Sequence, residues 1–141
     1  MRAPYALPVR NRDAMFAAAC AAVLGGAPST LHALATGRDP LEATKAAGSI
    51  LLTQETRTLR LIAAAVPLHV ALSLGWAIAF ERAGIRGAAR GAAAGLGIAV
   101  LDLGVGRRFP RVRALRLVPQ VADHLVYGAV AGSVLARRAR D

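Results

Sequence analysis

Several kinds of residue are scarce in this chain of 141 residues, and each scarcity excludes something. Cys20 is the only cysteine, so no disulfide can form within the chain. The phosphate-binding glycine loop, the His-rich zinc motif and the G-x-S-x-G elbow of hydrolases are all missing. We therefore predict that the protein is not an enzyme and that it holds no cofactor and no metal ion.

Acidic residues are also scarce, at 8 Asp and Glu against 18 Lys and Arg, which gives a net charge of +10. On a soluble protein such a charge would suggest nucleic acid. Here the basic residues lie mostly in short segments between hydrophobic runs, so we predict anionic lipids, and not nucleic acid, as their partner. The side chains expected to contact lipid head groups are Arg107, Arg108, Arg111, Arg113 and Arg116.

No stretch of the sequence alternates like a β-strand, whereas long uncharged stretches are present. Hydrophobic residues make up 55% of the chain and the mean hydropathy is +0.45. Residues 61–80 and 14–37 carry no formal charge. A helix needs about 20 apolar residues to cross the hydrocarbon core of a bilayer. The sequence therefore predicts an all-α, polytopic membrane protein.

We expect one helical membrane domain, residues 14–136, between a polar N-terminal segment (1–13) and a basic tail (137–141). Four transmembrane helices are predicted, at about residues 14–34, 59–80, 87–105 and 115–135. Asp39, Pro40 and Glu42 form a good helix start, but the apolar part that follows is too short to span. Residues 40–56 are therefore predicted to form an amphipathic helix that lies in the membrane interface.

The orientation of these spans does not follow from charge. In a four-span topology the 18 basic residues divide evenly between the two sides of the membrane, so the positive-inside rule does not predict an orientation. We favour a multi-pass protein of the cell membrane with both termini in the cytoplasm.

Small residues recur at four-residue spacing in every predicted span, and such spacing lets helix backbones approach closely in a membrane. These faces are predicted to hold the bundle together, or to dock a second copy or a partner membrane protein. The glycines expected at helix contacts are Gly75, Gly87, Gly91, Gly95, Gly128 and Gly132.

Ionisable and polar residues also fall inside the spans, where they are costly unless they face the bundle interior or a cavity. We expect them to form an intramembrane polar cluster, with His69, Asp123 and His124 near the midplane. Adjacent residues of a helix point about 100° apart, so Asp123 and His124 are poorly arranged to share a metal. The predicted cluster comprises His32, His69, Asp102, Gln120, Asp123 and His124.

Two interpretations of this cluster remain open. Each polar group is satisfied by a neighbour and fixes the register of the helices, or the carboxylates and imidazoles form a proton or cation site. Pro28, Pro67 and Pro119 precede the polar residues, and a proline removes one backbone hydrogen bond and can bend a helix.

Two segments carry a resemblance to a known type of protein: Gly26 to Gly48 (GAPSTLHALATGRDPLEATKAAG) and Val121 to Gly128 (VADHLVYG). The chain resembles small multi-spanning membrane proteins of unknown function from high-GC bacteria. This resemblance implies a helical membrane protein and no particular chemistry. Three functions are consistent with the sequence: a structural or accessory membrane subunit, a small transporter or proton-coupled protein, and an anionic-lipid-binding protein.

Overall fold

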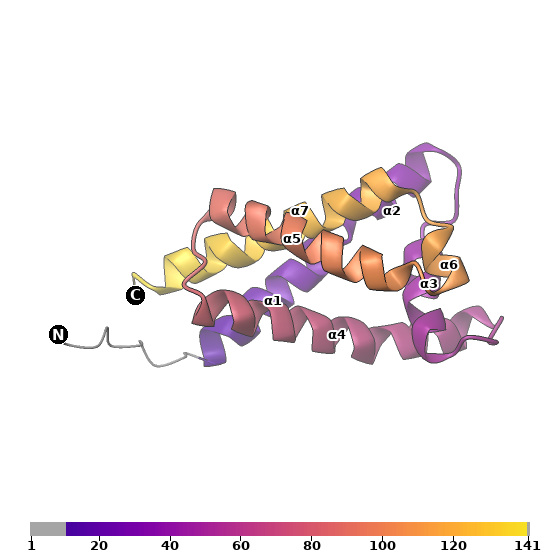
Figure 1. Cartoon of the computed structure of the whole chain (residues 1–141), viewed down its shortest axis with the longest axis horizontal. Coiled ribbons are helices and arrows are strands. Elements are labelled where there is room, and N and C mark those ends of the chain that lie inside the picture. The colour runs from indigo at the N-terminus through magenta and orange to yellow at the C-terminus, as the bar shows by residue number, and fades with distance from the viewer. Residues whose placement is uncertain (1–10, 141) are drawn as a thin grey trace.

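The computed structural model describes residues 11–140, and every regular element in this range is helical (Figure 1). The predicted all-α class is confirmed. Residues 1–10 of the predicted polar segment lie outside the described residues. The helices are α1 (Asn11–Gly25), α2 (Ala27–Ala35), α3 (Glu42–Leu51), α4 (Thr58–Arg82), α5 (Ala88–Gly106), α6 (Pro110–Arg113) and α7 (Leu117–Arg138).

Three segments of the described chain are long and apolar enough to cross a membrane: Asn11–Ala35, Thr58–Arg82 and Ala88–Gly106. They coincide with the first three predicted spans. Helix α7 has 22 residues, which is sufficient length, but it is not among the three. Its polar residues, such as Gln120, Asp123 and His124, lower its hydropathy. A membrane crossing by α7 stays a prediction.

The first of these segments was predicted as one span in which Pro28 can bend the helix, and it consists of two helices. Helix α1 ends at Gly25, and α2 begins at Ala27 with Pro28 in its first turn. Pro28 has no N–H to donate to the preceding turn, and Gly26 adds backbone freedom, so the two residues together interrupt the helix. Pro67, by contrast, lies inside α4 without ending it.

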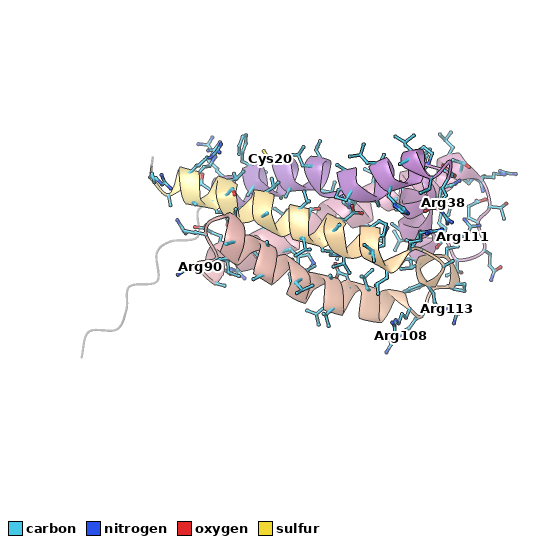
Figure 2. The ribbon with its side chains drawn as sticks, turned by 90° about the horizontal axis from the view of Figure 1, so that it is seen from above. Cys20, Arg38, Arg90, Arg108, Arg111 and Arg113 are labelled. Atoms are coloured by element: carbon cyan, nitrogen blue, oxygen red, sulfur yellow. The ribbon has the colours of Figure 1, made fainter. Side chains whose placement is uncertain are left out.

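Helix α7 is at the centre of the bundle. It packs along α5 on one side and along α1 and α2 on the other, while α1 also packs against α4. Figure 2 shows α7 between these neighbours. The two ends of the described chain lie at the same end of the bundle (Figure 1), where an Arg138 guanidinium N–H donates to the Asp13 carboxylate over 3.4 Å.

Helix α3 and the short helix α6 lie at the opposite end, and α3 runs across the direction of α4 (Figure 1). The predicted helix at 40–56 exists but is shorter, since α3 covers only Glu42–Leu51. Asp39 accepts a hydrogen bond from the Leu41 N–H at 2.9 Å, so it caps the turn before the helix. A Cβ on Gly48 would lie 1.9 Å from the Leu61 carbonyl oxygen, so α3 touches the backbone of α4.

The largest group of buried apolar side chains joins α1, α4, α5 and α7. Within it, the Phe80 and Tyr127 rings meet edge to face, with centroids 6.4 Å apart. Large apolar side chains are also exposed on α4, α5 and α7. Most of them lie in the half of each helix that is nearer to α3 and α6. The buried cluster consists of Ala17, Ala21, Phe80, Ile98, Tyr127, Ala131 and Leu135.

Candidate functional site

A glycine seam joins α5 to α7, and it consists of Gly87, Gly91, Gly95, Gly128 and Gly132. A Cβ on Gly91 would lie 2.0 Å from the Gly128 carbonyl oxygen, and a Cβ on Gly128 would lie 2.1 Å from that of Gly91. The Gly87 N–H donates to the Gly132 carbonyl at 2.7 Å. The two backbones are therefore in contact along the seam, which leaves no room for a side chain at Gly91, Gly95, Gly128 and Gly132, while Gly87 has a positive φ of 88° that favours glycine.

Gly75 does not belong to such a contact, and its predicted packing role within the bundle is wrong. It is exposed, and no atom lies within 4 Å of the position of a Cβ. Helix α4 buries Ser73 and Ala77 instead. Residues two positions apart on a helix point about 200° apart, so the face that carries Gly75 is turned away from α1.

The seam brings together two residues of the predicted polar cluster, which were not predicted as a pair. His124 of α7 and Asp102 of α5 are both half-buried, and the His124 Nε2 lies 3.5 Å from the Asp102 carboxylate. The His124 Nδ1 lies 2.7 Å from the Gln120 carbonyl oxygen, and it donates there because a carbonyl only accepts. Nε2 is then the nitrogen that faces Asp102. Gln120 takes part through its backbone and not through its side chain.

Asp123 faces a different helix from its neighbour His124. The Ser29 N–H donates to the Asp123 carboxylate at 2.8 Å. Ser29 is in the first turn of α2, where the break at Gly26 leaves N–H groups without helical acceptors. A carboxylate at a helix N-terminus is stabilised by the helix dipole. Asp123 therefore supplies a hydrogen-bond acceptor that the helix break takes away from Ser29.

His69 of α4 engages the other side of the same break. Its Nε2 lies 3.2 Å from the carbonyl oxygen of Ala22, which is in the last turn of α1. Carbonyls in the last turn of a helix lack helical donors. His69 was predicted to face the interior, but the residue is exposed. Each side of the break is therefore contacted by another helix: the Asp123 carboxylate of α7 accepts from α2, and the His69 imidazole of α4 contacts the end of α1.

His32 does not join the other predicted residues through a hydrogen bond. Its Nε2 is buried and finds no hydrogen-bond partner among the described residues, and the same holds for the Trp76 Nε1. No group of three His, Cys, Asp or Glu residues within residues 11–140 is placed to hold a metal ion. The structure therefore divides the predicted cluster into separate contacts between helices.

Two residues of this region were missing from the predicted cluster. Ser29 supplies the N–H that Asp123 accepts, and Tyr127 donates its hydroxyl hydrogen to the Ser73 carbonyl, which ties α7 to α4. Tyr127 follows His124 by three residues, so its place on the polar face of α7 was visible in the sequence. Pro28 marks the helix break beside Ser29, but nothing in the sequence identifies Asp123 as the acceptor.

Two surface hollows lie at the two ends of the bundle, away from His69, Asp102, Asp123 and His124. Near the termini, the Arg138 guanidinium also stacks over the Phe16 ring at 4.1 Å. The hollow there is lined by Asn11, Arg12, Asp13, Phe16 and Arg138. The hollow near α3 and α6 is lined by Arg38, Glu42, Lys45, Ala46, Arg111, Ala114 and Leu115.

The five arginines predicted to contact head groups lie around α6. Arg111 donates to the Glu55 carbonyl at 2.9 Å, which ties α6 to the connection between α3 and α4. Figure 2 shows Arg108, Arg111 and Arg113 at the same end of the molecule as Arg38. Apart from Arg111, these predicted arginines are exposed and form no ion pair with a described residue, and we call them the α6 arginines: Arg107, Arg108, Arg113 and Arg116.

Comparisons with protein-family models, with curated proteins and with solved structures found no match to this chain. Its function therefore has to be inferred from the geometry of these contacts.

Proposed function

We propose that this chain is a four-span membrane protein that serves as a structural or accessory subunit of the membrane. The observation that carries the proposal is the surroundings of α7. Residues 119–136 of this helix include no exposed residue. Its polar side chains face other helices: Asp123 faces α2, His124 faces α5 and Tyr127 faces α4. A helix shielded in this way does not need an apolar sequence to lie in a membrane.

The same contacts favour a structural role for the polar residues. Asp123 and His69 each bond a backbone group of the broken helix, and Tyr127 bonds the backbone of α4. Hydrogen bonds between membrane helices contribute about 0.6 kcal/mol each on average. Groups engaged with backbone partners are poorly available to carry a substrate or an ion.

The crossing by α7 is tested with single cysteines in a Cys20→Ser background. Arg113→Cys and Arg140→Cys place a thiol before and after α7, at exposed positions. In sealed vesicles, four spans require that a membrane-impermeant maleimide reaches only one of the two sites before the bilayer is opened. Equal labelling of both sites would show that α7 does not cross.

A proton-coupled protein is the second candidate, and the Asp102–His124 pair favours it. A carboxylate and an imidazole 3.5 Å apart form a pair that can exchange a proton. Purified protein in liposomes with an internal pH dye distinguishes the candidates. A structural subunit leaves an imposed pH gradient intact in both the wild type and Asp102→Asn. Proton flux through the wild type that Asp102→Asn abolishes would establish the second candidate.

A further inference from the structure

The end of the bundle that carries α3 and α6 has more positive charge than its own carboxylates neutralise. Apart from Asp102, which faces His124, the described residues at this end include three acidic ones, and each is already engaged. Arg38 pairs with Glu42 at 2.9 Å, Arg60 pairs with Glu55 at 3.1 Å, and Lys45 pairs with Asp39.

For Asp39 and Glu55 these contacts favour the charged carboxylate. The backbone N–H of Arg57, followed by the Arg60 side chain, lowers the pKa of Glu55 below its ordinary value. The Lys45 ammonium lowers the pKa of Asp39 in the same way. Since residues 103–122 include no acidic residue, the α6 arginines have no carboxylate of this region left to pair with.

The α6 arginines are displayed on a compact turn. The Phe109 N–H donates to the Gly106 carbonyl at 2.9 Å, and a Cβ on Gly106 would lie 2.7 Å from a Val112 methyl. The bond from Arg111 to the Glu55 carbonyl anchors α6 against the neighbouring connection. The backbone positions of the four arginines therefore lie on one short connection between the end of α5 and the start of α7.

Exposed apolar side chains flank these arginines on both sides. Val105, at the end of α5, is 58% exposed, and Leu117 and Val118, at the start of α7, are 57% and 79% exposed. A soluble polyanion would leave these side chains in water. A lipid satisfies both features, because its phosphate meets the arginines while its acyl chains cover the apolar residues.

We propose that Arg107, Arg108, Arg113 and Arg116 bind the phosphates of anionic lipids, with Val105, Leu117 and Val118 against the acyl chains. The inference rests on the proposed membrane location. The favoured head group carries a phosphate without a compensating amine, as in phosphatidylglycerol. Guanidinium groups suit this role because their fork of N–H donors matches two phosphate oxygens at once.

The opposite end provides a matched control. Arg82, Arg90, Arg137 and Arg140 are equally exposed and form no ion pair with a described residue. The exposed residues next to them in the chain, Ala83, Ala89 and Ala139, are small and offer little surface to an acyl chain; Met15 and Phe16 of α1 are the exposed large apolar residues nearer this end. Replacing these four arginines removes the same charge from the chain as replacing the α6 arginines.

The test compares spin-labelled phosphatidylglycerol with spin-labelled phosphatidylcholine in vesicles that hold the full chain. The immobilised fraction of each lipid gives the preference of the protein for phosphatidylglycerol. We expect the variant R107Q/R108Q/R113Q/R116Q to lose this preference by about tenfold. The variant R82Q/R90Q/R137Q/R140Q should retain most of it. An equal loss in both variants, or no loss in either, would overturn the proposal.

Two further outcomes separate this inference from the proposals on which it depends. If wild-type protein immobilises neither lipid, the membrane location itself fails. If it immobilises both lipids equally, only the anionic-lipid site fails.

Inorganic phosphate is compared with chloride at equal ionic strength. Loss of the preference in phosphate alone would assign the arginines to a free phosphate, and tight binding of an RNA oligonucleotide with no lipid preference would assign them to nucleic acid.

Discussion

The seam between α5 and α7 and the outer face of α4 carry the same sequence pattern but differ completely in packing. Gly91 and Gly95 meet Gly128 with their backbones in contact, whereas Gly75, with Ala71 and Ala79 on either side of it, lies exposed. Small residues at four-residue spacing permit close approach of two helices. The comparison shows that this spacing does not decide which of the permitted faces finds a partner.

The difference between the two faces follows from the other contacts that α4 and α5 make. Helix α4 contacts α1 with another side, which contains Ser73 and Ala77, and there the Tyr127 hydroxyl reaches the Ser73 carbonyl. Helix α5 has Gly91, Gly95 and Asp102 on the side facing α7, so close packing and the contact with His124 support each other. A face that combines small residues with a polar partner is the one that packs.

The largest effect is expected from filling the seam. Gly128→Val places a Cβ 2.1 Å from the Gly91 carbonyl oxygen and adds two methyl groups where backbones touch. We expect a loss of at least about 3 kcal/mol in the free energy of unfolding, since overpacking of this severity requires the helices to separate. Denaturation of the purified protein in mixed micelles, followed by circular dichroism, measures this loss. If the free energy of unfolding of this variant equals that of the wild type, α5 and α7 are not in close backbone contact at Gly128.

A smaller loss in the free energy of unfolding is expected when the Ser29 N–H at the helix break loses its hydrogen-bond acceptor. Asp123→Ala removes the oxygen that accepts the Ser29 N–H, so a partly buried donor becomes unsatisfied. Such a loss costs about 1–3 kcal/mol. Asp123→Asn keeps an oxygen acceptor and should recover about half of the loss. If Asp123→Asn raises the melting temperature above that of the wild type, the carboxylate is held for function at the expense of stability.

Tyr127→Phe should have a still smaller effect. The hydroxyl that donates to the Ser73 carbonyl is lost, while the ring keeps its edge-to-face contact with Phe80. One hydrogen bond between membrane helices contributes about 0.6 kcal/mol on average to the free energy of unfolding. The same denaturation measurement applies. Phe80→Leu is a useful comparison because it removes the ring contact and leaves the hydrogen bond; a loss in Tyr127→Phe larger than that in Phe80→Leu would mean that the hydroxyl is the more important of the two.

Much of the fold was accessible from the sequence. The two uncharged stretches identified the segments that became α1 with α2 and α4, because the length of an apolar run is a direct physical requirement for crossing a bilayer. The span that became α5 was predicted although it contains Arg90 and Asp102. The glycines of the seam were also predicted individually. The break at Gly26 was not, since Pro28 lies beside a helix break while Pro67 lies inside α4 without ending it, and a proline alone does not distinguish the two cases.

The candidate site was predicted as a set of residues but not as a set of pairs. Helical periodicity places Asp102 and His124 on faces that point inward, yet the pairing depends on the register of α5 against α7, which the glycine contacts fix in space. Likewise, the charge of the α6 arginines was plain in the sequence. Their lack of carboxylate partners emerged only when Asp39, Glu42 and Glu55 were found engaged elsewhere.

The smallest effect, and the sharpest test of the comparison, is expected at Gly75. Gly75→Val adds the same side chain as Gly128→Val, at a position where nothing lies within 4 Å of the new Cβ. The free energy of unfolding should change by no more than about 0.5 kcal/mol, as for other substitutions away from contacts. A loss comparable to that of Gly128→Val would mean that the exposed face of α4 is covered in the native protein. Cross-linking in the membrane would then show a larger assembly in the wild type that Gly75→Val dissociates, and the pattern on α4 would hold copies of the chain together as the seam holds its helices.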